Sequence, residues 1–324
     1  MAGAGSYLVA DIGGTNARFA IARGSARDGF RLEEVRRFKN EDFEKLRDAA
    51  FAFMQSCSGD KPTAGCFAVA GPIADGEVRL TNSNWRFRPD ELAEELGLEH
   101  LVAANDFAAQ ARGALLSAPE DQVELAAGEA VPGAPCAVLG PGTGLGLGLL
   151  VPDGERVNVV ATEGGHAGFS PRTDEEVEVG KFIADEFGFC SWERLLSGRG
   201  LVNIHRAICD IEGVTWGGYR PEKITERALE DAGSISRRTV DLFCNVLGGY
   251  AGDVAVITGA RGGVYLGGGI LPKILPILRE SAFHARFCRR GPMSKYAESI
   301  PVRLVQSDAP ALMGAAAIAE EGGL

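Results

Sequence analysis

The most constraining feature of the chain is a pattern that occurs twice: an apolar strand-like segment, a glycine turn with a threonine, and another apolar segment. The first copy spans residues 8–21 and contains Thr15, and the second spans residues 137–151 and contains Thr143. Glycines between buried strands let backbone N–H groups approach an anion closely. Either copy alone is more simply interpreted as an ordinary hairpin. The matched pair predicts a duplicated core whose two turns hold one nucleotide.

Strand-like and helix-like segments alternate around the two copies, which indicates an α/β protein. Strands are predicted at residues 31–38, 66–70, 101–104, 157–161, 263–270 (running into a glycine turn) and 302–305. Helices are predicted from an acidic start at residues 40–42 through residue 53, and at 89–97, 173–188, 235–257, 271–279 and 308–321.

The length of 324 residues exceeds the usual size of one hydrophobic core, so two domains are expected. We place the small α/β domain at residues 1–117 plus 307–324 and the large α/β domain at residues 118–306. No low-complexity linker separates them in the sequence, so the junction is predicted to be a packed hinge. In this arrangement the terminal helix crosses back to the first half.

Charge and cysteine usage exclude several classes of protein. The formal net charge of −11 argues against nucleic acid as a partner, although backbone N–H groups and a divalent metal can still hold a nucleotide. The apolar stretch near residues 145–151 is too short to cross a membrane, and no signal peptide is recognisable. Seven cysteines without metal-ligand spacing indicate reduced thiols in a cytoplasmic protein.

Asp11 stands at the end of the first predicted strand, beside the turn formed by Gly13, Gly14 and Thr15. A carboxylate in this place repels phosphate directly. The arrangement makes chemical sense if Mg²⁺, with its waters, lies between the two groups. The alternative is that Asp11 accepts hydrogen bonds from the N–H groups of its own turn.

Asn105 and Asp106 follow the strand predicted at 101–104, at the carboxyl end where α/β folds bind ligands. Asp106 is a candidate general base. An aspartate can accept a proton late in a loose phosphoryl-transfer transition state, when the attacking oxygen has become acidic. Asn105 can orient the substrate oxygen. The alternative is an Asn-Asp helix cap, which this segment by itself favours.

Three further segments carry polar or glycine-rich patterns. Glu163 and His166 flank two glycines and can hydrogen-bond neighbouring hydroxyls of one sugar ring, or form a plain turn with a surface histidine. Glu193 near a helix start is, by itself, an ordinary N-terminal glutamate. Gly267, Gly268 and Gly269 follow an apolar strand and permit close backbone approach to a flat or phosphorylated group.

Seven motifs in a fixed order resemble those of the bacterial glucokinase family, of the type without a zinc motif. They are DIGGTNAR (11–18), TNSNW (81–85), NDF (105–107), GPGTG (140–144), EGGH (163–166), SGRGLVN (197–203) and GGVYLGGGI (262–270). The resemblance spans about residues 6–318. One departure is Pro141, where relatives often have a small residue. It leaves the sugar-contacting positions unchanged.

The resemblance implies a duplicated actin-like ATPase-domain fold of the ribonuclease H-like type, with two domains around a cleft. It implies ATP- and Mg²⁺-dependent phosphorylation of glucose at the 6-hydroxyl by a cytoplasmic protein that is usually a homodimer. Asp106 resembles the catalytic base, and Asn105, Asp106, Glu163, His166 and Glu193 resemble sugar ligands. The positions resembling nucleotide-binding segments are Ala10, Asp11, Ile12, Gly13, Gly14 and Thr15, then Gly142 and Thr143, then Gly267, Gly268 and Gly269.

Three other functions share parts of this pattern. A kinase for another hexose would have the same loops. A sugar-binding regulator without catalysis is a second alternative. A repressor would need a DNA-binding segment, for which the acidic chain, with its first strand near residue 6, is expected to have no room. An actin-like phosphatase or ATPase would not need Glu163 and His166.

Overall fold

The computed structural model describes residues 5–71, 73–80, 84–154 and 156–322, so residues 81–83 of the predicted motif at 81–85 lie outside the described residues. The chain divides into two compact units. The first comprises Met1–Asp121, Leu150–Ala161 and Ser307–Leu324, and the second comprises Gln122–Leu149 and Thr162–Gln306. Residues 118–121 and 150–161, which we assigned to the large domain from the sequence, group with the first unit.

The first unit contains a five-stranded sheet with the order β3-β2-β1-β4-β8. Its strands are β1 (Gly5–Ile12), β2 (Asn16–Ser25), β3 (Gly29–Lys39), β4 (Ala64–Val69) and β8 (His100–Asn105). Neighbours among β1, β2 and β3 are antiparallel, whereas β1, β4 and β8 run parallel. All six residues of β4 are buried, as expected for a parallel strand covered on both faces. A small separate sheet contains β5 (Ile73–Ala74), β6 (Glu77–Arg79) and β7 (Arg86–Phe87).

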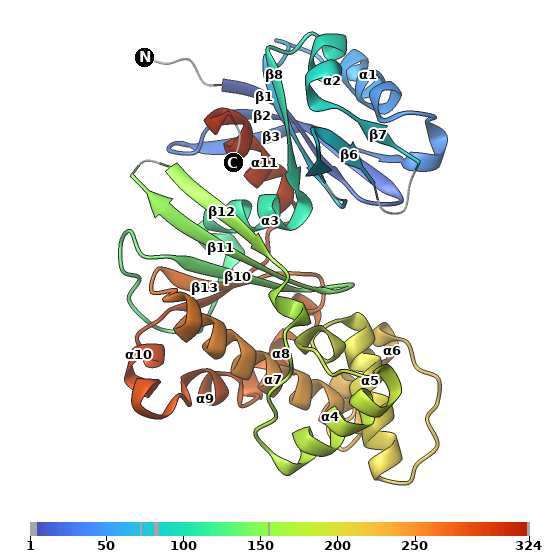
Figure 1. Ribbon diagram of the computed structural model, residues 1–324, viewed down its shortest axis with the longest axis vertical. Helices are drawn as coiled ribbons and strands as arrows, with labels where there is room; N and C mark the ends of the chain where they lie inside the picture. The colour runs from blue at the N-terminus through green and yellow to red at the C-terminus, as the bar shows by residue number, and fades with distance from the viewer. Residues whose placement is uncertain (1–4, 72, 81–83, 155, 323–324) are drawn as a thin grey trace. The chain divides into compact units, whose positions relative to one another are not determined.

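Helices cover both faces of the first sheet. They are α1 (Leu46–Ser56), α2 (Pro89–Leu96), α3 (Asp106–Leu115) and α11 (Pro310–Glu321), with 3₁₀ turns at Asn40–Asp42 and Pro119–Asp121. Alternate residues of β1 face opposite sides: Leu8 packs in the cluster with α1 and α2, and Val9 packs in the cluster with α11. Figure 1 shows α11, in red, against the blue strands of this unit. The prediction that the terminal helix returns to the first half is therefore confirmed.

Helices α3 and α11 pack with almost no space between their backbones. A methyl group on Gly314 would collide with the carbonyl oxygen of Ala109, and one on Gly113 would collide with that of Pro310. The Arg112 guanidinium also donates to the Glu321 carboxylate at 2.6 Å, and both side chains are largely buried. The position of α3, which begins with Asp106, therefore depends on glycines in both helices.

The second large sheet has six strands in the order β12-β11-β10-β13-β14-β9. Its strands are β9 (Gln122–Ala126), β10 (Cys136–Pro141), β11 (Leu145–Asp153), β12 (Arg156–Thr162), β13 (Gly263–Leu266) and β14 (Val302–Val305). β10, β13 and β14 run parallel, and β9 is antiparallel to β14. Without β9, the order is third, second, first, fourth and fifth strand, as in the first sheet. The α/β class is thus observed, with one strand order in both sheets.

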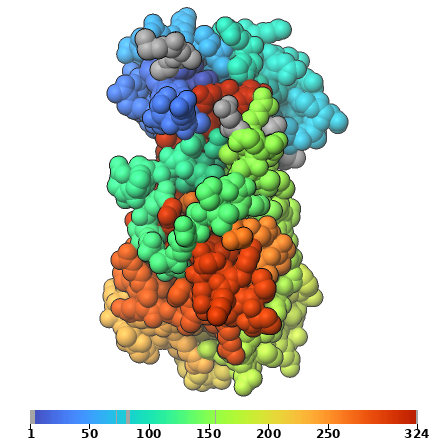
Figure 2. Space-filling model, turned by 90° about the vertical axis from the view of Figure 1, so that its left-hand side faces the viewer, coloured from blue at the N-terminus to red at the C-terminus, as the bar shows by residue number. Residues whose placement is uncertain are grey.

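Seven α-helices occur among the described residues of the second unit. They are α4 (Asp174–Phe187), α5 (Gly198–Ile211), α6 (Pro221–Glu230), α7 (Ile235–Thr258), α8 (Leu275–Glu280), α9 (Phe283–Cys288) and α10 (Ser294–Glu298), with 3₁₀ turns at Gly164–His166, Trp192–Arg194, Leu271–Ile274 and Gly291–Met293. The red-orange segments that include α9 and α10 form the surface of this unit that faces the viewer in Figure 2.

Helix α7 has the length and apolar composition of a membrane-spanning helix, but 72% of its most apolar window is buried inside the protein. It packs against α5, α6 and α9. Its residues Phe243, Leu247 and Ala251 are fully buried in the main core cluster of this unit. We therefore interpret α7 as a core helix.

Two helix predictions are wrong in detail. The acidic segment Asn40–Asp42 forms a 3₁₀ turn, and α1 begins only at Leu46. The Asn40 side-chain oxygen, the group that would cap a helix, is buried and accepts no hydrogen bond, while its amide nitrogen donates to the carbonyl oxygen of Gly13 at 2.9 Å. The helix predicted at 271–279 is a 3₁₀ turn at Leu271–Ile274 followed by α8. Pro276 has no N–H to donate to the preceding turn, which prevents one continuous helix.

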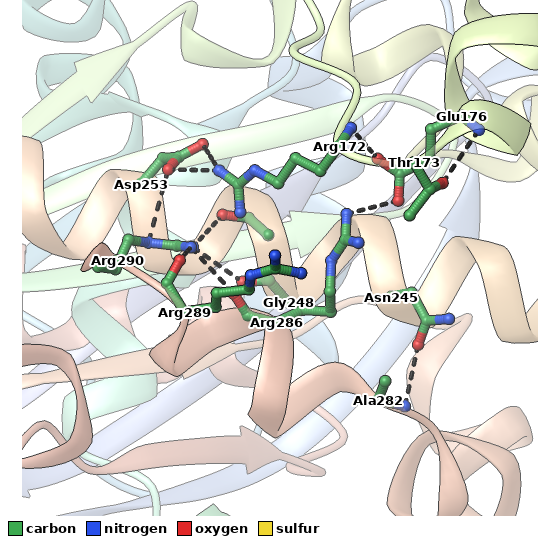
Figure 3. Close-up of polar contacts among 11 residues, drawn as sticks. Arg172, Thr173, Glu176, Asn245, Gly248, Asp253, Ala282, Arg286, Arg289 and Arg290 are labelled. Atoms are coloured by element: carbon green, nitrogen blue, oxygen red, sulfur yellow. Dashed lines mark hydrogen bonds and ion pairs between the residues drawn. The ribbon is translucent and has the colours of Figure 1, made fainter. Parts of the chain in front are cut away.

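A network of charged side chains joins α4, α7 and α9 (Figure 3). Arg172 donates to both carboxylate oxygens of Asp253, at 2.6 and 2.5 Å, and Arg290 Nε lies 3.5 Å from the same carboxylate. Arg286 pairs with Glu176 at 2.5 Å. Arg290 also donates to the Gly248 and Gly249 carbonyls of α7, and burial lowers its pKa. Three arginines therefore share two carboxylates.

Asp253→Asn is expected to lower the free energy of unfolding by about 2 kcal/mol, because it leaves two guanidinium groups without their shared counter-ion. Arg290 is only 6% exposed, so water cannot replace the lost carboxylate. Urea unfolding of both proteins measures the difference. Glu226→Gln, which removes the exposed ion pair with Lys223, is the control and should cost less than about 0.5 kcal/mol. Equal effects of the two substitutions would contradict a structural role for the network.

Candidate active site

The carboxyl edge of the first sheet collects the predicted site residues of the first unit. In the parallel register, Ile12 aligns with Val69, and Val69 aligns with Asn105. The ends of β1 and β8 therefore lie two strands apart at one edge, followed by the glycine turn and by Asp106 respectively. Ligands of open α/β sheets bind outside this edge.

The first glycine turn is held by its own backbone and by Asn40. Gly13 N–H donates to the carbonyl oxygen of Asn16 at 3.0 Å, and Asn40 N–H donates to that of Thr15 at 3.0 Å. Thr15 is exposed at the tip, whereas the side chains of Ala10 and Ile12 are buried in the core. These two can therefore offer a ligand only backbone groups. A cavity of about 590 Å³ opens beside the turn, lined by Gly14, Thr15, Asn16, Lys39, Asn40, Glu41, Phe43, Glu44, Asn84 and Trp85.

Asp11 contacts Arg18 rather than the N–H groups of its own turn. Arg18 Nη2 lies 3.3 Å from Asp11 Oδ2, and Arg18 Nη1 donates to the carbonyl oxygen of Asp308 at 3.0 Å. The Asp11 side chain is 31% exposed, so one carboxylate oxygen can still serve an ion. No cluster of three metal-ligating side chains occurs within the described ranges. A single carboxylate fits Mg²⁺, which proteins commonly bind through one or two carboxylates, substrate phosphates and waters.

Asn105 is a helix cap, as its segment alone suggested. Its side-chain oxygen accepts hydrogen bonds from Phe107 N–H at 3.0 Å and Ala108 N–H at 3.1 Å, which fixes the start of α3. Asp106 follows as the first residue of α3, and its Oδ1 accepts from Phe107 N–H at 2.7 Å. The cap leaves the amide nitrogen of Asn105 available and holds the Asp106 carboxylate at the sheet edge.

Burial raises the pKa of Asp106, and the nearby Asp11 charge raises it further, while the hydrogen bond from Phe107 N–H acts in the opposite direction. A general base must be ionised, so activity should be lost as the pH falls through this raised pKa. We expect the acid limb of the kcat/KM profile to lie above the ordinary aspartate value of 3.8. Rates measured from pH 4 to 8 test this, and a limb at or below the ordinary value would contradict it.

In the second unit, the second and third glycine turns lie side by side. Gly142 N–H donates to the carbonyl oxygen of Gly144 at 2.8 Å, and Thr143 is exposed at the tip, as Thr15 is in the first turn. Gly267 N–H donates to the carbonyl oxygen of Leu139 at 2.8 Å. Gly268 has a φ of 89°, and a methyl group there would collide with the backbone of Pro141. Glycine is therefore required where the two turns meet.

The Glu163–His166 segment is a 3₁₀ turn that lies directly on the start of β11. A methyl group on Gly165 would collide with the carbonyl oxygen of Leu145, which explains the glycine. The Glu163 side chain is 92% exposed, that of His166 is 61% exposed, and Glu163 Oε2 lies 3.8 Å from His166 Nε2. Both polar groups can therefore reach a ligand.

Glu193 lies beside the same strand, in the 3₁₀ turn Trp192–Arg194. Its Oε2 accepts a hydrogen bond from Leu145 N–H at 2.9 Å. The buried Trp192 ring anchors this turn against Tyr250 and Phe169, with ring centroids 4.8 and 5.1 Å away. The structure thus brings Glu163, His166, Glu193 and the two glycine turns together around the start of β11.

Comparison with known proteins identifies the family. A sequence profile described as "Glucokinase" matches residues 8–322. The chain belongs to the glucokinase family. The family indicated by the seven motifs is therefore confirmed. Glucokinases phosphorylate glucose at the expense of ATP, and this chain is an enzyme of that class.

Individual relatives match over nearly the whole chain. The glucokinase of Saccharophagus degradans is 40% identical over 311 residues, covering 96% of this chain and 97% of the relative. A glucokinase crystal structure from an Antarctic psychrotroph has a TM-score of 0.92 and 37% identity, covering 98% of this chain and 99% of the other. A ROK family glucokinase from Streptomyces griseus, solved with glucose and AMPPNP, shares the fold with a TM-score of 0.63 and 22% identity, covering 98% of this chain and 100% of the other.

Sequence reasoning missed two contacts of this glucokinase-family site. Arg18 faces Asp11 across the β1–β2 hairpin, and the position of the tight turn could have indicated this register. Gly198 N–H, at the start of α5, donates to the carbonyl oxygen of Gly142 at 2.8 Å. No sequence pattern near Gly198 indicates that contact, because it joins segments far apart in the chain.

Proposed function

We propose that this chain transfers the terminal phosphoryl group of ATP to the 6-hydroxyl of glucose, on a duplicated actin-like ATPase fold of the ribonuclease H-like type. One observation carries the proposal. Apart from β9, the two large sheets have the same strand order, and each has a glycine turn with an exposed threonine directly after its central strand, β1 or β10. Such turns suit the phosphate chain of one nucleotide, since each presents backbone N–H groups to an anion.

In the proposed reaction Asp106 accepts the proton of the 6-hydroxyl as that oxygen attacks the phosphoryl group. The raised pKa of Asp106 makes the carboxylate a better proton acceptor than an ordinary aspartate. The protein forms no covalent bond with the phosphoryl group. Most of the rate gain comes from positioning the hydroxyl in line and from neutralising phosphate charge.

We propose that the residues that contact the sugar are Asn105, Asp106, Glu163, His166 and Glu193. Hydrogen-bonding side chains discriminate a sugar by its hydroxyls, because a missing hydroxyl leaves a polar group unpaired. Glu163 and His166 are exposed and thus ready for such contacts.

Nucleotide is proposed to bind at Gly13, Gly14 and Thr15, at Gly142 and Thr143, and at Gly267–Gly269 near the adenosine, with Ala10 and Ile12 placing the first turn. Asp11, through water, would hold Mg²⁺. When bound, Mg²⁺ would neutralise charge on the β- and γ-phosphates. Arg18 Nη2 donates to Asp11 Oδ2 at 3.3 Å and so restricts the orientation of this carboxylate.

We also propose that the enzyme is a cytoplasmic homodimer. The seven free cysteines suit a reducing compartment, and the dimer is what membership of the family implies. Light scattering at several protein concentrations tests the dimer, and a monomer at all of them would contradict it.

ADP release with glucose, fructose, mannose and N-acetylglucosamine as acceptors tests the proposed function. We expect the highest kcat/KM with glucose and negligible ADP release without sugar. A higher kcat/KM with another hexose would indicate a different sugar kinase. Glucose binding without turnover would indicate a regulator, and sugar-independent hydrolysis would indicate a plain ATPase.

A further inference from the structure

Gly144, in the second glycine turn, is placed to control the position of Glu193, a side chain that we propose binds the sugar. Glu193 Oε2 accepts a hydrogen bond from Leu145 N–H at 2.9 Å, at the point where that turn enters β11. The Glu193 carboxylate, which we propose binds the sugar, is therefore hydrogen-bonded to the backbone of the glycine turn that we propose binds phosphate. This inference rests on the proposed function.

Glu193 reaches Leu145 N–H only because residue 144 has no side chain. A Cβ on Gly144 would lie 2.5 Å from Glu193 Oε2 and 3.3 Å from its Cδ, and the three atoms nearest to that Cβ all belong to Glu193. Gly144 has no positive φ, so alanine is compatible with the backbone conformation there. The main consequence of alanine at 144 is therefore displacement of the Glu193 carboxylate.

Neither the turn at 142–145 nor the segment at 193–198 can easily move to relieve this contact. Gly142 N–H donates to the carbonyl oxygen of Gly144 at 2.8 Å, and Gly198 N–H donates to that of Gly142 at 2.8 Å. On the other side, Ser197 Oγ donates to the carbonyl oxygen of Glu193 at 2.8 Å and itself accepts from Gly200 N–H at 2.9 Å. These hydrogen bonds hold the turn at 142–145 against the segment at 193–198.

We infer that Gly144 is a positioning residue for glucose, acting through Glu193. Its missing side chain lets Leu145 N–H occupy one carboxylate oxygen and hold the other toward the sugar. The Glu193 carboxylate thus contacts both the glycine turn at 142–145 and the proposed sugar.

A double-mutant cycle tests the inference, with glucose dissociation constants measured by calorimetry on the full chain without nucleotide. Gly144→Ala should weaken glucose binding about 10–100-fold, the cost of losing a well-placed charged hydrogen bond. In a Glu193→Ala background the same change should alter the dissociation constant less than about twofold, because the residue it displaces is gone. An equal loss in both backgrounds, or none in either, would overturn the inference.

Steady-state kinetics provide a measurement that does not need the Glu193→Ala variant to bind glucose measurably. Gly144→Ala should raise the KM for glucose at least about fivefold more than the KM for ATP, since its methyl group meets Glu193 first. A defect confined to the KM for ATP would overturn the inference. Gly233→Ala, an exposed turn glycine whose added Cβ meets nothing closer than 3.4 Å, is the matched control and should change neither KM. If the wild-type protein bound no glucose, the proposed function itself would fail.

Discussion

Asp106→Asn is expected to lower kcat by about 10²–10⁴, the usual contribution of a general base. Asparagine has the same shape, and its side-chain oxygen can still accept the hydrogen bond that Phe107 N–H donates to Asp106 Oδ1. It cannot accept a proton from the sugar hydroxyl. The glucose dissociation constant should change far less than kcat, because the hydrogen bonds of the ground state are largely retained.

The Asp106→Asn protein should also be at least as stable as the wild type. The pKa of Asp106 is raised in the folded protein, so the ionised carboxylate that predominates at neutral pH is disfavoured by folding. A neutral amide removes this cost. Asp90→Asn, which changes an exposed carboxylate in the first turn of α2, is the matched control and should leave kcat unchanged. Near-normal turnover of Asp106→Asn would contradict the assignment of the base.

Gly314→Ala is expected to lower the free energy of unfolding by about 3 kcal/mol, because its methyl group would collide with the Ala109 carbonyl oxygen of α3. Helix propensity alone predicts the opposite sign, since alanine is about 1 kcal/mol better than glycine within a helix. A lower free energy of unfolding would therefore show that the collision between the two helices outweighs the gain in helix propensity. Urea unfolding measures it.

The same substitution should lower kcat, since Ala109 lies in the first turn of the helix that begins with Asp106. Gly180→Ala is the matched control in α4, where the added methyl group meets only the movable Phe169 ring, at 3.3 Å. It should change stability by less than about 1 kcal/mol. A Gly314→Ala protein that is more stable than the wild type would contradict the close packing of α3 and α11.

The parts of the fold governed by local patterns could be predicted from the sequence. The alternating apolar segments and glycine turns indicated the strands of both large sheets except β9 (Gln122–Ala126), which was not predicted. Gly97 and Gly188 end α2 and α4 in the left-handed conformation that glycine favours. The helix expected from residue 40 does not begin there, since the Asn40 side-chain oxygen caps no backbone N–H. The Asn40 amide nitrogen instead donates to the Gly13 carbonyl, and this contact joins two separate segments. Local sequence carries no signal for such a contact.

In the candidate site, too, some residues could be placed from the sequence and others could not. Asp11 and Asp106 could be placed at one sheet edge, because Asp11 lies at the end of one parallel strand and Asp106 follows another, and the carboxyl ends of such strands share an edge. The attachment of Glu193 to Leu145 N–H could not be predicted. It depends on how the turn at Trp192 packs against Tyr250 and Phe169, and packing of this kind is set by tertiary structure.

The proposed reaction is tested most directly by ³¹P NMR of the product formed from ATP, Mg²⁺ and glucose by the purified wild-type protein. We expect a phosphomonoester at the 6-position of glucose that accumulates with ADP in equal amounts, and almost none with the Asp106→Asn protein under the same conditions. Inorganic phosphate as the main product, or a phosphorylated sugar made equally fast by the Asp106→Asn protein, would contradict it.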